Sequence, residues 1–371
     1  MPLYLTEDQA MLRDTARELM AAEGSIANQL RKYRDMGCKD GFGHALWKQF
    51  AELGLTGILI DEADGGLGLG HVEAGIVLEE IGRNLTPSPF LITAVAIVEA
   101  LRGTAQRERW LPGILAGETV GALAVDEGPK HRPEAIAMTA ERSGNGFRLS
   151  GRKQFVVQGA SADLIVVAAR TDEGLTLFAV EKDSQGLEIE GVRLADSSIG
   201  ARLDFRDVEV DSDAVIGEVG SGDSVLGRVL AAGRAGAAAE MVGLASGAME
   251  MTVDYLKQRK QFGRLIGEFQ ALQHRAAHLY SELEIARAAA LKAQQLLDES
   301  AEEAELMVSV AKAKAGLVST LAAQEGVQMH GGIGMTDEYD IGLYMKRDRV
   351  LNELFGDANY HADKVARMKG Y

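Results

Sequence analysis

The stretch LFGDANYH at residues 354–361 contains an acid, Asp357, directly after Gly356. A carboxylate in a dry pocket has its pKa raised toward neutral pH, and it can then act as a general base. The same acid would also be ordinary as a helix cap or as one half of an ion pair. The stretch therefore raises the question of whether Asp357 is a catalytic base.

Two segments upstream of this stretch have features of an anion-binding site. In QRKQFGRLIGEFQALQH, residues 258–274, Arg259 ends one predicted helix and a new helix begins near Gly267. An arginine and backbone amides near a helix start can bind a diphosphate. In QMHGGIGMT, residues 328–336, adjacent glycines let the backbone approach a ligand closely. A turn with a solvated arginine and a helix C-cap explain the two segments equally well.

Two further motifs resemble known sites without fitting them. The glycine-rich run GGLGLG, Gly65–Gly70, precedes helices, whereas a dinucleotide-binding fingerprint needs a repeated βαβ context. We interpret this run as a loop between helices. His274 and His278 have the one-turn spacing of a zinc pair, but neither a third ligand nor a general-base glutamate accompanies them. The sequence therefore predicts no metal site.

The composition is typical of a cytoplasmic protein with several domains. Of the 371 residues 46% are hydrophobic and 25% are charged, and the length exceeds one ordinary core. The net charge of −16 opposes binding to nucleic acid or to an anionic membrane surface. The single cysteine, Cys38, indicates a reducing compartment. The N-terminus lacks a signal-peptide pattern and instead predicts a helix capped by Thr6, with Gln9 at the third position.

The hydrophobic pattern divides the chain into three parts. Residues 1–118 have helical spacing, residues 119–217 have short β-like runs between glycine and acidic turns, and residues 218–371 are again helical. We therefore predict an α+β fold with an N-terminal helical domain, a middle β domain and a C-terminal helical bundle. The long helices of the bundle are expected at about 225–258, 269–298, 302–329 and 338–369.

The arginine-x-x-phenylalanine-glycine turn at residues 259–263 and the glutamine-x-x-Gly-Gly-x-Gly turn at residues 328–334 together resemble the FAD-binding turns of the acyl-CoA dehydrogenase family. The resemblance covers nearly the whole chain, including GGLGLGHVEAGIVLEEIGR in the first part and GNGFRLSGRKQFVVQGASADLIVVAAR in the second. It implies a small β barrel, a four-helix bundle and a tetramer. It also implies FAD-dependent α,β-dehydrogenation of an acyl-CoA in fatty acid β-oxidation, with electron-transfer flavoprotein as the electron acceptor.

The resemblance assigns roles to individual residues. Arg234 matches an arginine that faces the thioester. Gln328, Gly331 and Gly332 would hold the FAD diphosphate from a neighbouring subunit. The other residues that match FAD contacts are Arg259, Phe262, Phe269, Gln270 and Phe155, the last as a ring stacked near the flavin.

The chain departs from the family pattern at the positions of the catalytic base. The usual glutamate follows an arginine-aspartate pair, and here Arg347-Asp348 leads to Gly356. Some branches place the glutamate just before the arginine that Arg234 matches, and here that residue is Gly233. Both familiar base positions are therefore glycine.

The middle part departs from the family as well. The stretch VDEGPKHRPEA replaces the family's active-site stretch Thr-Glu-Pro-Gly-Ala-Gly-Ser-Asp, and Val157 replaces a threonine that donates to the flavin. Glu240 lies two helical turns after Gly233, about 10 Å along the helix axis. The acids that could replace the missing base are Asp357, Glu240, Asp126 and Glu127.

Three hypotheses follow from these departures. One of the four acids could serve as the base of a homomeric enzyme. Alternatively, the chain could be the small subunit of a heteromeric enzyme, because LFGDANYH and QMHGGIGMT look most like the small subunits of pimeloyl-CoA dehydrogenase-type enzymes. A larger homologous subunit would then bring the base. The third hypothesis is a flavin-free acyl-CoA-binding or scaffold protein on the same fold.

Overall fold

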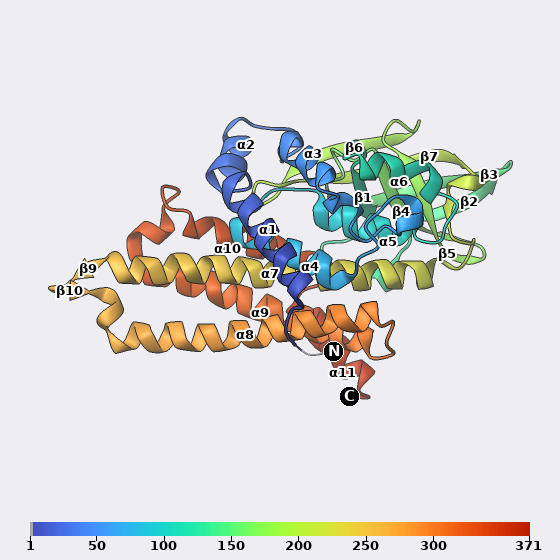
Figure 1. Ribbon diagram of the computed structural model, residues 1–371. Helices are drawn as coiled ribbons and strands as arrows, with labels where there is room; N and C mark the ends of the chain where they lie inside the picture. Colours follow the sequence, from blue (N-terminus) through green and yellow to red (C-terminus); the bar gives the residue numbers. More distant parts are fainter. Residues whose placement is uncertain (1–2) are drawn as a thin grey trace. The chain divides into compact units, whose positions relative to one another are not determined.

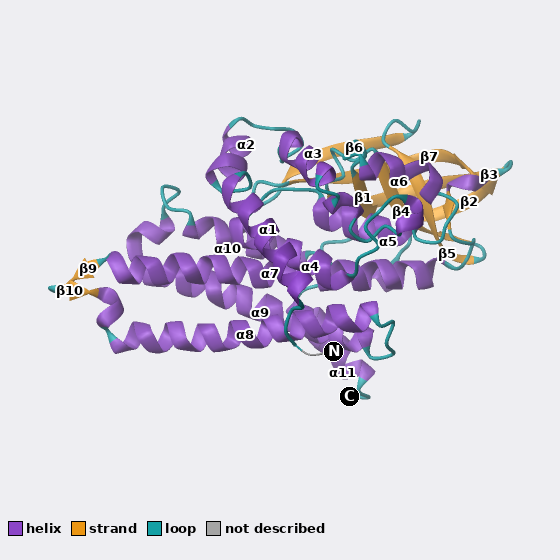
Figure 2. Cartoon of the chain, viewed as in Figure 1, coloured by secondary structure: helices purple, strands orange, loops and turns teal. Residues whose placement is uncertain are grey.

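The structure, a computed structural model, describes residues 3–371 as two compact units that interleave along the sequence (Figure 1). The first unit contains the segment up to Arg31, His71–Thr86 and Arg234–Tyr371. It is helical apart from one short hairpin (Figure 2). The second unit contains Lys32–Gly70 and Pro87–Gly233, and it carries the large sheet.

The first unit begins with helix α1 (Glu7–Ala22), which packs on α4 (His71–Asn84). The predicted capping box of α1 is confirmed: the Gln9 amide donates to the Thr6 hydroxyl at 3.2 Å, and the Gln9 side chain accepts from the Thr6 amide at 3.0 Å. Such a box satisfies backbone donors that the first turn of a helix leaves unpaired.

The rest of the first unit is a bundle of long helices. An added Cβ at Gly243 would lie 1.8 Å from the Glu79 carbonyl oxygen, so glycine is what lets the bundle approach α4 so closely. A small hairpin joins the first two long helices. The elements are α7 (Gly222–Gln258, of which the residues from Arg234 onward belong to this unit), β9 (Lys260–Gln261), β10 (Arg264–Leu265), α8 (Gln270–Asp298), α9 (Ala304–His330), α10 (Ile341–Glu353) and α11 (Ala358–Met368).

The prediction of one continuous last helix over residues 338–369 is wrong. The backbone turns between α10 and α11, where Phe355 has a φ of 60° and Gly356 a φ of 102°. Both values lie in the left-handed region, which a helix cannot continue through. Asp357 then caps α11 by accepting from the Tyr360 amide at 2.8 Å. The helical periodicity on either side of the turn hid this break.

Helix α9 is the one described stretch of residues 3–371 that is long and apolar enough to cross a membrane. It packs against α8, α10 and α11, and it carries the fully buried Lys312. A central helix of a bundle meets the same length and composition criteria as a membrane span.

The helices of the second unit are short. Trp47, Phe50 and Phe90 form its aromatic centre, with the ring centroids of Phe50 and Phe90 6.2 Å apart. The run Gly65–Gly70 is a loop that precedes α4, as the sequence predicted. The elements are α2 (Lys32–Asp35), α3 (His44–Glu52), α5 (Val98–Leu101), α6 (Arg107–Leu115) and a π-helical segment at Leu91–Ile97.

The sheet of the second unit has eight strands and is mixed, with parallel pairs β1–β4 and β2–β4 among antiparallel ones. Its core contains Phe147 and Phe178, whose centroids are 5.2 Å apart. The path is β6-β7-β3-β2-β4-β5-β8, with β1 paired to β4. The strands are β1 (Gly121–Ala124), β2 (Thr139–Ser143), β3 (Gly146–Val157), β4 (Leu164–Thr171), β5 (Gly174–Glu181), β6 (Leu187–Arg193), β7 (Ile199–Asp211) and β8 (Val215–Ile216).

These elements confirm the predicted fold class, with helices first, a β region in the middle and a helical bundle at the end. Strand β6 was not predicted, although Leu187 and Ile189 alternate with polar residues and pack against the sheet core. Such alternation over a few residues is the signal of a half-buried strand.

Candidate functional site

The two glycine-containing turns of the sequence meet at one end of the bundle. Tyr255, near the end of α7, stacks on His330, the last residue of α9, with ring centroids 4.3 Å apart and planes inclined by 27°. Tyr339 packs on the other two rings, 4.8 Å from His330. The aromatic cluster thus places the hairpin after α7 and the turn after α9 next to each other.

The hairpin β9–β10 extends beyond the helices at the tip seen in Figure 1. Phe262 at this tip is 91% exposed, with its ring edge toward Phe269 at 6.3 Å. The Arg259 side chain is exposed and has no hydrogen bond or ion pair within residues 3–371, and Gln270 is exposed as well. A planar aromatic ring and a solvated guanidinium are groups that a nucleotide cofactor can use.

The turn after α9 leaves room for a ligand. Gly331 caps the helix with a φ of 65°, and its amide donates to the Gln328 carbonyl oxygen. No atom lies within 4 Å of a Cβ added at Gly331 or at Gly332. The turn therefore caps α9 and at the same time leaves its backbone open to a ligand.

His330 beside this turn has an unused acceptor. Its Nδ1 donates to the Gly326 carbonyl oxygen at 2.7 Å, and its buried Nε2 has no partner within residues 3–371. Burial lowers the pKa of His330. Together with the open glycines, this orphaned polar atom fits a cofactor that binds against the end of α9.

The α10–α11 turn is built around Gly356. An added Cβ at this position would lie 2.4 Å from Cδ1 of Tyr360, so the Tyr360 ring fills the space into which a side chain would grow. The Gly356 amide donates to the Glu353 carbonyl oxygen at 3.3 Å. That amide is therefore part of the turn itself.

Three basic side chains donate to the carbonyl groups of this turn. The Arg234 guanidinium donates to Phe355 O at 3.1 Å, and His361 Nε2 donates to the same oxygen at 3.1 Å. Lys312 Nζ lies 3.0 Å from both Leu351 O and Gly356 O. All three basic side chains are buried.

The environment of the turn lowers the pKa of Lys312 and of His361. Burial, with the nearby Arg234 charge, lowers the pKa of Lys312 to about 7. Burial, with the charges of Arg234 and Lys312, lowers the pKa of His361 to about 2. His361 is therefore a neutral imidazole near pH 7.

The acids predicted as alternative bases have structural partners. Asp357 caps α11. The buried Glu240 accepts from Arg347 at 2.5 and 3.0 Å. Their catalytic roles stay predictions.

The acids of the middle region are also engaged. The Asp126 carboxylate contacts His131 Nδ1 at 2.9 Å. The Glu127 carboxylate accepts from the Met138 amide at 3.0 Å and from the fully buried Lys153 at 2.8 Å. The Lys153 contact helps to keep the pKa of Glu127 low, although burial opposes this effect. A cavity of about 390 Å³ lies beside this segment, at Val125–Ile136.

Phe155 lies at an irregularity in the β3–β7 ladder. The register shifts between Lys153 and Val156, and Phe155 has a φ of 52°. A bulge of this kind re-aims the side chain of the extra residue. Phe155 is half-buried, and the neighbouring Val157 is buried.

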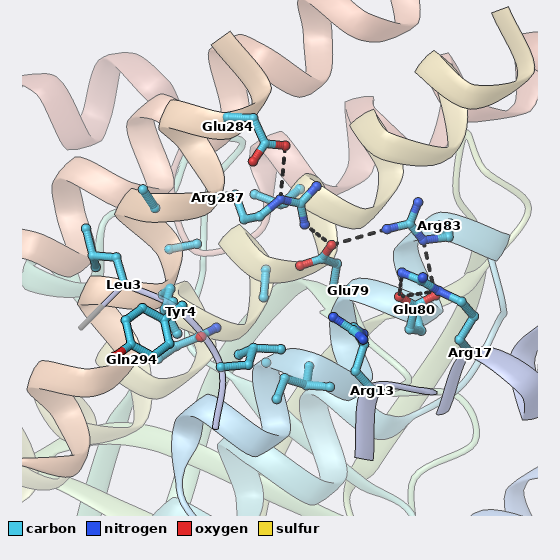
Figure 3. Close-up of a pocket in the computed structure, with 18 residues that line it drawn as sticks. Leu3, Tyr4, Arg13, Arg17, Glu79, Glu80, Arg83, Glu284, Arg287 and Gln294 are labelled. Carbon is cyan, nitrogen blue, oxygen red and sulfur yellow. Dashed lines mark hydrogen bonds and ion pairs between the residues drawn. The ribbon is translucent and has the colours of Figure 1, made fainter. Parts of the chain in front are cut away.

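The charged cavity in Figure 3 was not predicted from the sequence. It has a volume of about 370 Å³ and is lined by side chains of α1, α4, α7 and α8 and by residues 3–5. Glu80 pairs with Arg17 and Arg83, and Glu79 pairs with Arg83 and Arg287. These pairs connect α1, α4 and α8, and none of the predicted site residues lines the cavity.

His274 and His278 are exposed on α8, and no group of three potential metal ligands occurs within residues 3–371. Lys312, Tyr360 and His361 were not predicted from the sequence as site residues. The available signal was weak, because a lysine in a helix usually lies at the surface.

Comparison with known proteins identifies the family. The acyl-CoA dehydrogenase N-terminal, middle and C-terminal domain models match residues 6–118, 126–208 and 220–369. The chain therefore belongs to the acyl-CoA dehydrogenase family, whose members are flavoprotein oxidoreductases that bind FAD.

Individual relatives agree with this assignment. Cyclohex-1-ene-1-carbonyl-CoA dehydrogenase of Geobacter metallireducens is 31% identical over 98% of this chain and 97% of its own length. Mitochondrial isovaleryl-CoA dehydrogenase of Solanum tuberosum is 33% identical over 83% of this chain and 78% of its own length. A solved variant of the steroid ACAD Tcur3481-Tcur3483 superposes with a TM-score of 0.90 at 30% identity, covering 98% of each chain.

Proposed function

We propose that this chain is a FAD-dependent acyl-CoA dehydrogenase subunit that lacks the family's catalytic glutamate and works with a larger homologous subunit that supplies the base. Bound FAD would accept the hydride removed from the β-carbon of the thioester. The chain's own contribution would be to hold the cofactor and to form one wall of the thioester site.

The observation that carries this proposal is the packing at Gly356, the residue that we match to the base position. The Tyr360 ring occupies the space of a side chain there, with only 2.4 Å to an added Cβ. Tyr360 thus fills the space that a side chain at this position would need. The neighbouring acid, Asp357, faces its own helix as a cap. A chain that abstracted a proton itself would need a carboxylate within reach of the substrate.

FAD binding is supported by the end of the bundle. Arg259, Phe262 and Gln270 are exposed there, and the Gly331–Gly332 backbone is open. We propose that the first group binds FAD within one chain and that Gln328 and the two glycines reach the diphosphate of a neighbouring subunit. Phe269 would extend the aromatic strip, Phe155 would stack near the flavin, and Arg234 would remain on the thioester side.

Several further assignments belong to the same proposal. The domain boundaries would fall near residues 118 and 217, and the location would be cytoplasmic. The assembly would be a tetramer, and electron-transfer flavoprotein would reoxidise the flavin. The name of the steroid relative joins two gene products, Tcur3481 and Tcur3483, which is in keeping with a two-chain enzyme. A homo-oligomer that uses one of its own acids is the alternative within the family.

The first experiment tests cofactor binding. The purified chain should be yellow, with flavin absorbance at about 450 nm. Arg259→Ala and Gly332→Val should each weaken FAD binding by at least about tenfold, because each removes a charge-assisted contact or fills the open backbone. Arg367→Ala, which alters an exposed arginine of α11, is the matched control. A colourless protein that cannot be loaded with FAD would instead favour the flavin-free acyl-CoA-binding protein.

The second part tests the missing base. Dye-linked dehydrogenation should be absent with the chain alone and should appear when the larger homologous subunit is added. Asp357→Asn, which keeps a side chain suited to helix capping, should leave the activity of the pair within about twofold. Activity of the chain alone that disappears in Asp357→Asn, with FAD retained, would show that Asp357 is the base.

A further inference from the structure

Lys312 is a buried lysine whose hydrogen-bond partners within residues 3–371 are all backbone carbonyl groups. Its side chain is 0% exposed, and its Nζ lies 3.0 Å from Leu351 O, 3.0 Å from Gly356 O and 3.4 Å from Asn352 O. No carboxylate lies within ion-pair distance of it in residues 3–371. Burial of an ammonium without a paired acid is costly, so the position calls for an explanation.

The three carbonyl groups explain the position. They belong to the last turn of α10 and to the α10–α11 turn, which cannot satisfy them within a helix. Arg234 and His361 bind the carbonyl oxygen of Phe355 in the same turn. Donors from α7, α9 and α11 therefore converge on one short segment, and Lys312 binds the carbonyl groups of both Leu351 and Gly356.

We propose that Lys312 is a positioning residue that holds the Leu354–Asp357 turn in the shape needed for thioester binding. The inference rests on the proposed function, in which this turn forms one wall of the thioester site. Lys312 acts through the backbone of the turn and does not touch the substrate. Without its amino group, the carbonyl groups of Leu351 and Gly356 would lose a buried donor, and the turn would open more readily.

Charged groups from each neighbouring element surround Lys312. Arg234 lowers its proton affinity, whereas Asp348, Glu353 and Asp357 raise it, and the neutral His361 adds no charge near pH 7. In the closed turn the pKa is lowered from its usual 10.5 to about 7. When the turn opens, water restores the ordinary value. Between these two values the open form binds the proton better, so the closed turn becomes more stable as pH rises.

Hydrogen exchange tests this role without cofactor or substrate. In Lys312→Met, which keeps the volume of the side chain, amides of residues 354–360 should exchange at least about tenfold faster than in the wild type. Lys314→Met is the matched control, because Lys314 lies on the same helix and pairs with Glu282 at the edge of the bundle. Unchanged exchange of this segment in Lys312→Met would overturn the proposal.

The pH dependence separates positioning by Lys312 from general loss of packing. In the wild type the protection factors of the turn should rise between pH 7 and 10, by at most about tenfold per pH unit for one proton. Lys312→Gln keeps a donor but cannot titrate, and it should abolish this rise while restoring part of the protection lost in Lys312→Met. A rise that persists in Lys312→Gln would contradict the role of Lys312.

Binding measurements connect the turn to function. Lys312→Met should bind FAD as the wild type does, because Arg259 and the Gly331–Gly332 turn, which we propose to bind FAD, lie at the ends of α7 and α9 and not at the α10–α11 turn. It should bind the acyl-CoA preferred by the wild type, chosen from an acetyl- to palmitoyl-CoA series, at least about tenfold more weakly. An equal loss of affinity for FAD and for the acyl-CoA would contradict the proposed positioning role of Lys312. A wild type without FAD would refute the proposed function, while the exchange result would still stand.

Discussion

At Gly356 one residue decides what the α10–α11 turn can do. Its φ of 102° lies in the region that glycine alone tolerates easily, and the Tyr360 ring closes the remaining space. A side chain at this position would meet two separate penalties, one from the backbone and one from the ring. The glycine is therefore required by the turn that this chain has, whatever occupies the position in other proteins.

Gly356→Ala should accordingly destabilise the chain more than an alanine at an open glycine. We expect about 2–4 kcal/mol, because the left-handed backbone and the displaced Tyr360 each contribute. Gly37→Ala is the matched control, since Gly37 also has a positive φ but has no atom near its added Cβ. Its expected cost is about 1 kcal/mol. Urea denaturation measures both, and equal costs would show that Tyr360 moves aside without penalty.

At the scale of elements, α9 and α11 hold the turn between them. Helix α11 contributes His361, whose ring is fully buried and whose Nε2 donates to Phe355 O. Its Nδ1 is buried without a partner within residues 3–371. Burial disfavours protonation of that nitrogen, and the nearby Arg234 and Lys312 charges disfavour it further, so the pKa of His361 falls to about 2. The packing of these helices therefore depends on a neutral histidine.

This dependence predicts acid sensitivity. As pH falls below 6.5, the unfolded chain binds a proton at His361 and the folded chain does not until about pH 2, so stability is lost in this window. His361→Gln should remove up to about 1.4 kcal/mol per pH unit of that slope. The slope of the free energy of unfolding against pH is measured by denaturation between pH 7 and 4.5. The proteins compared are the wild type, His361→Gln and, as a control, the exposed His274→Gln. A His361→Gln slope equal to that of the wild type would contradict the prediction.

At the scale of the whole molecule, the bundle leaves large apolar side chains in water. Ile285 on α8 is 55% exposed and Leu317 on α9 is 62% exposed. The two helices pair antiparallel, with Lys314 opposite Glu282, so Ile285 and Leu317 lie on adjacent helices, offset by about 9 Å along the helix axis. Exposed apolar groups on adjacent helices are typical of a surface that a second subunit covers.

Leu317→Asp should therefore weaken the assembly of the chain. We expect a shift toward smaller species in sedimentation velocity, since a charge at a covered apolar position costs a few kcal/mol. Met368→Asp is the control, because Met368 is exposed at the end of α11. An unchanged distribution in Leu317→Asp would show that this surface is not an interface.

The sequence alone determined the features that depend on neighbouring residues. The capping box at Thr6, the helical and β regions and the two glycine-containing turns are local patterns, and their spacing is written directly in the chain. These local patterns also predicted, wrongly, one continuous helix through Gly356. The periodicity on both sides of this residue is helical, and a single glycine is tolerated in a helix.

Only the tertiary structure decided the roles of the side chains around that turn. Lys312 looks like a surface residue of α9 until the end of α10 packs against it, and Asp357 looks like a possible base until its carboxylate is seen capping α11. Burial and hydrogen-bond partners depend on segments far apart in the sequence. For that reason the sequence pattern indicated which segments would form the site. Tertiary packing determined which side chains in those segments are already engaged as caps or hydrogen-bond partners.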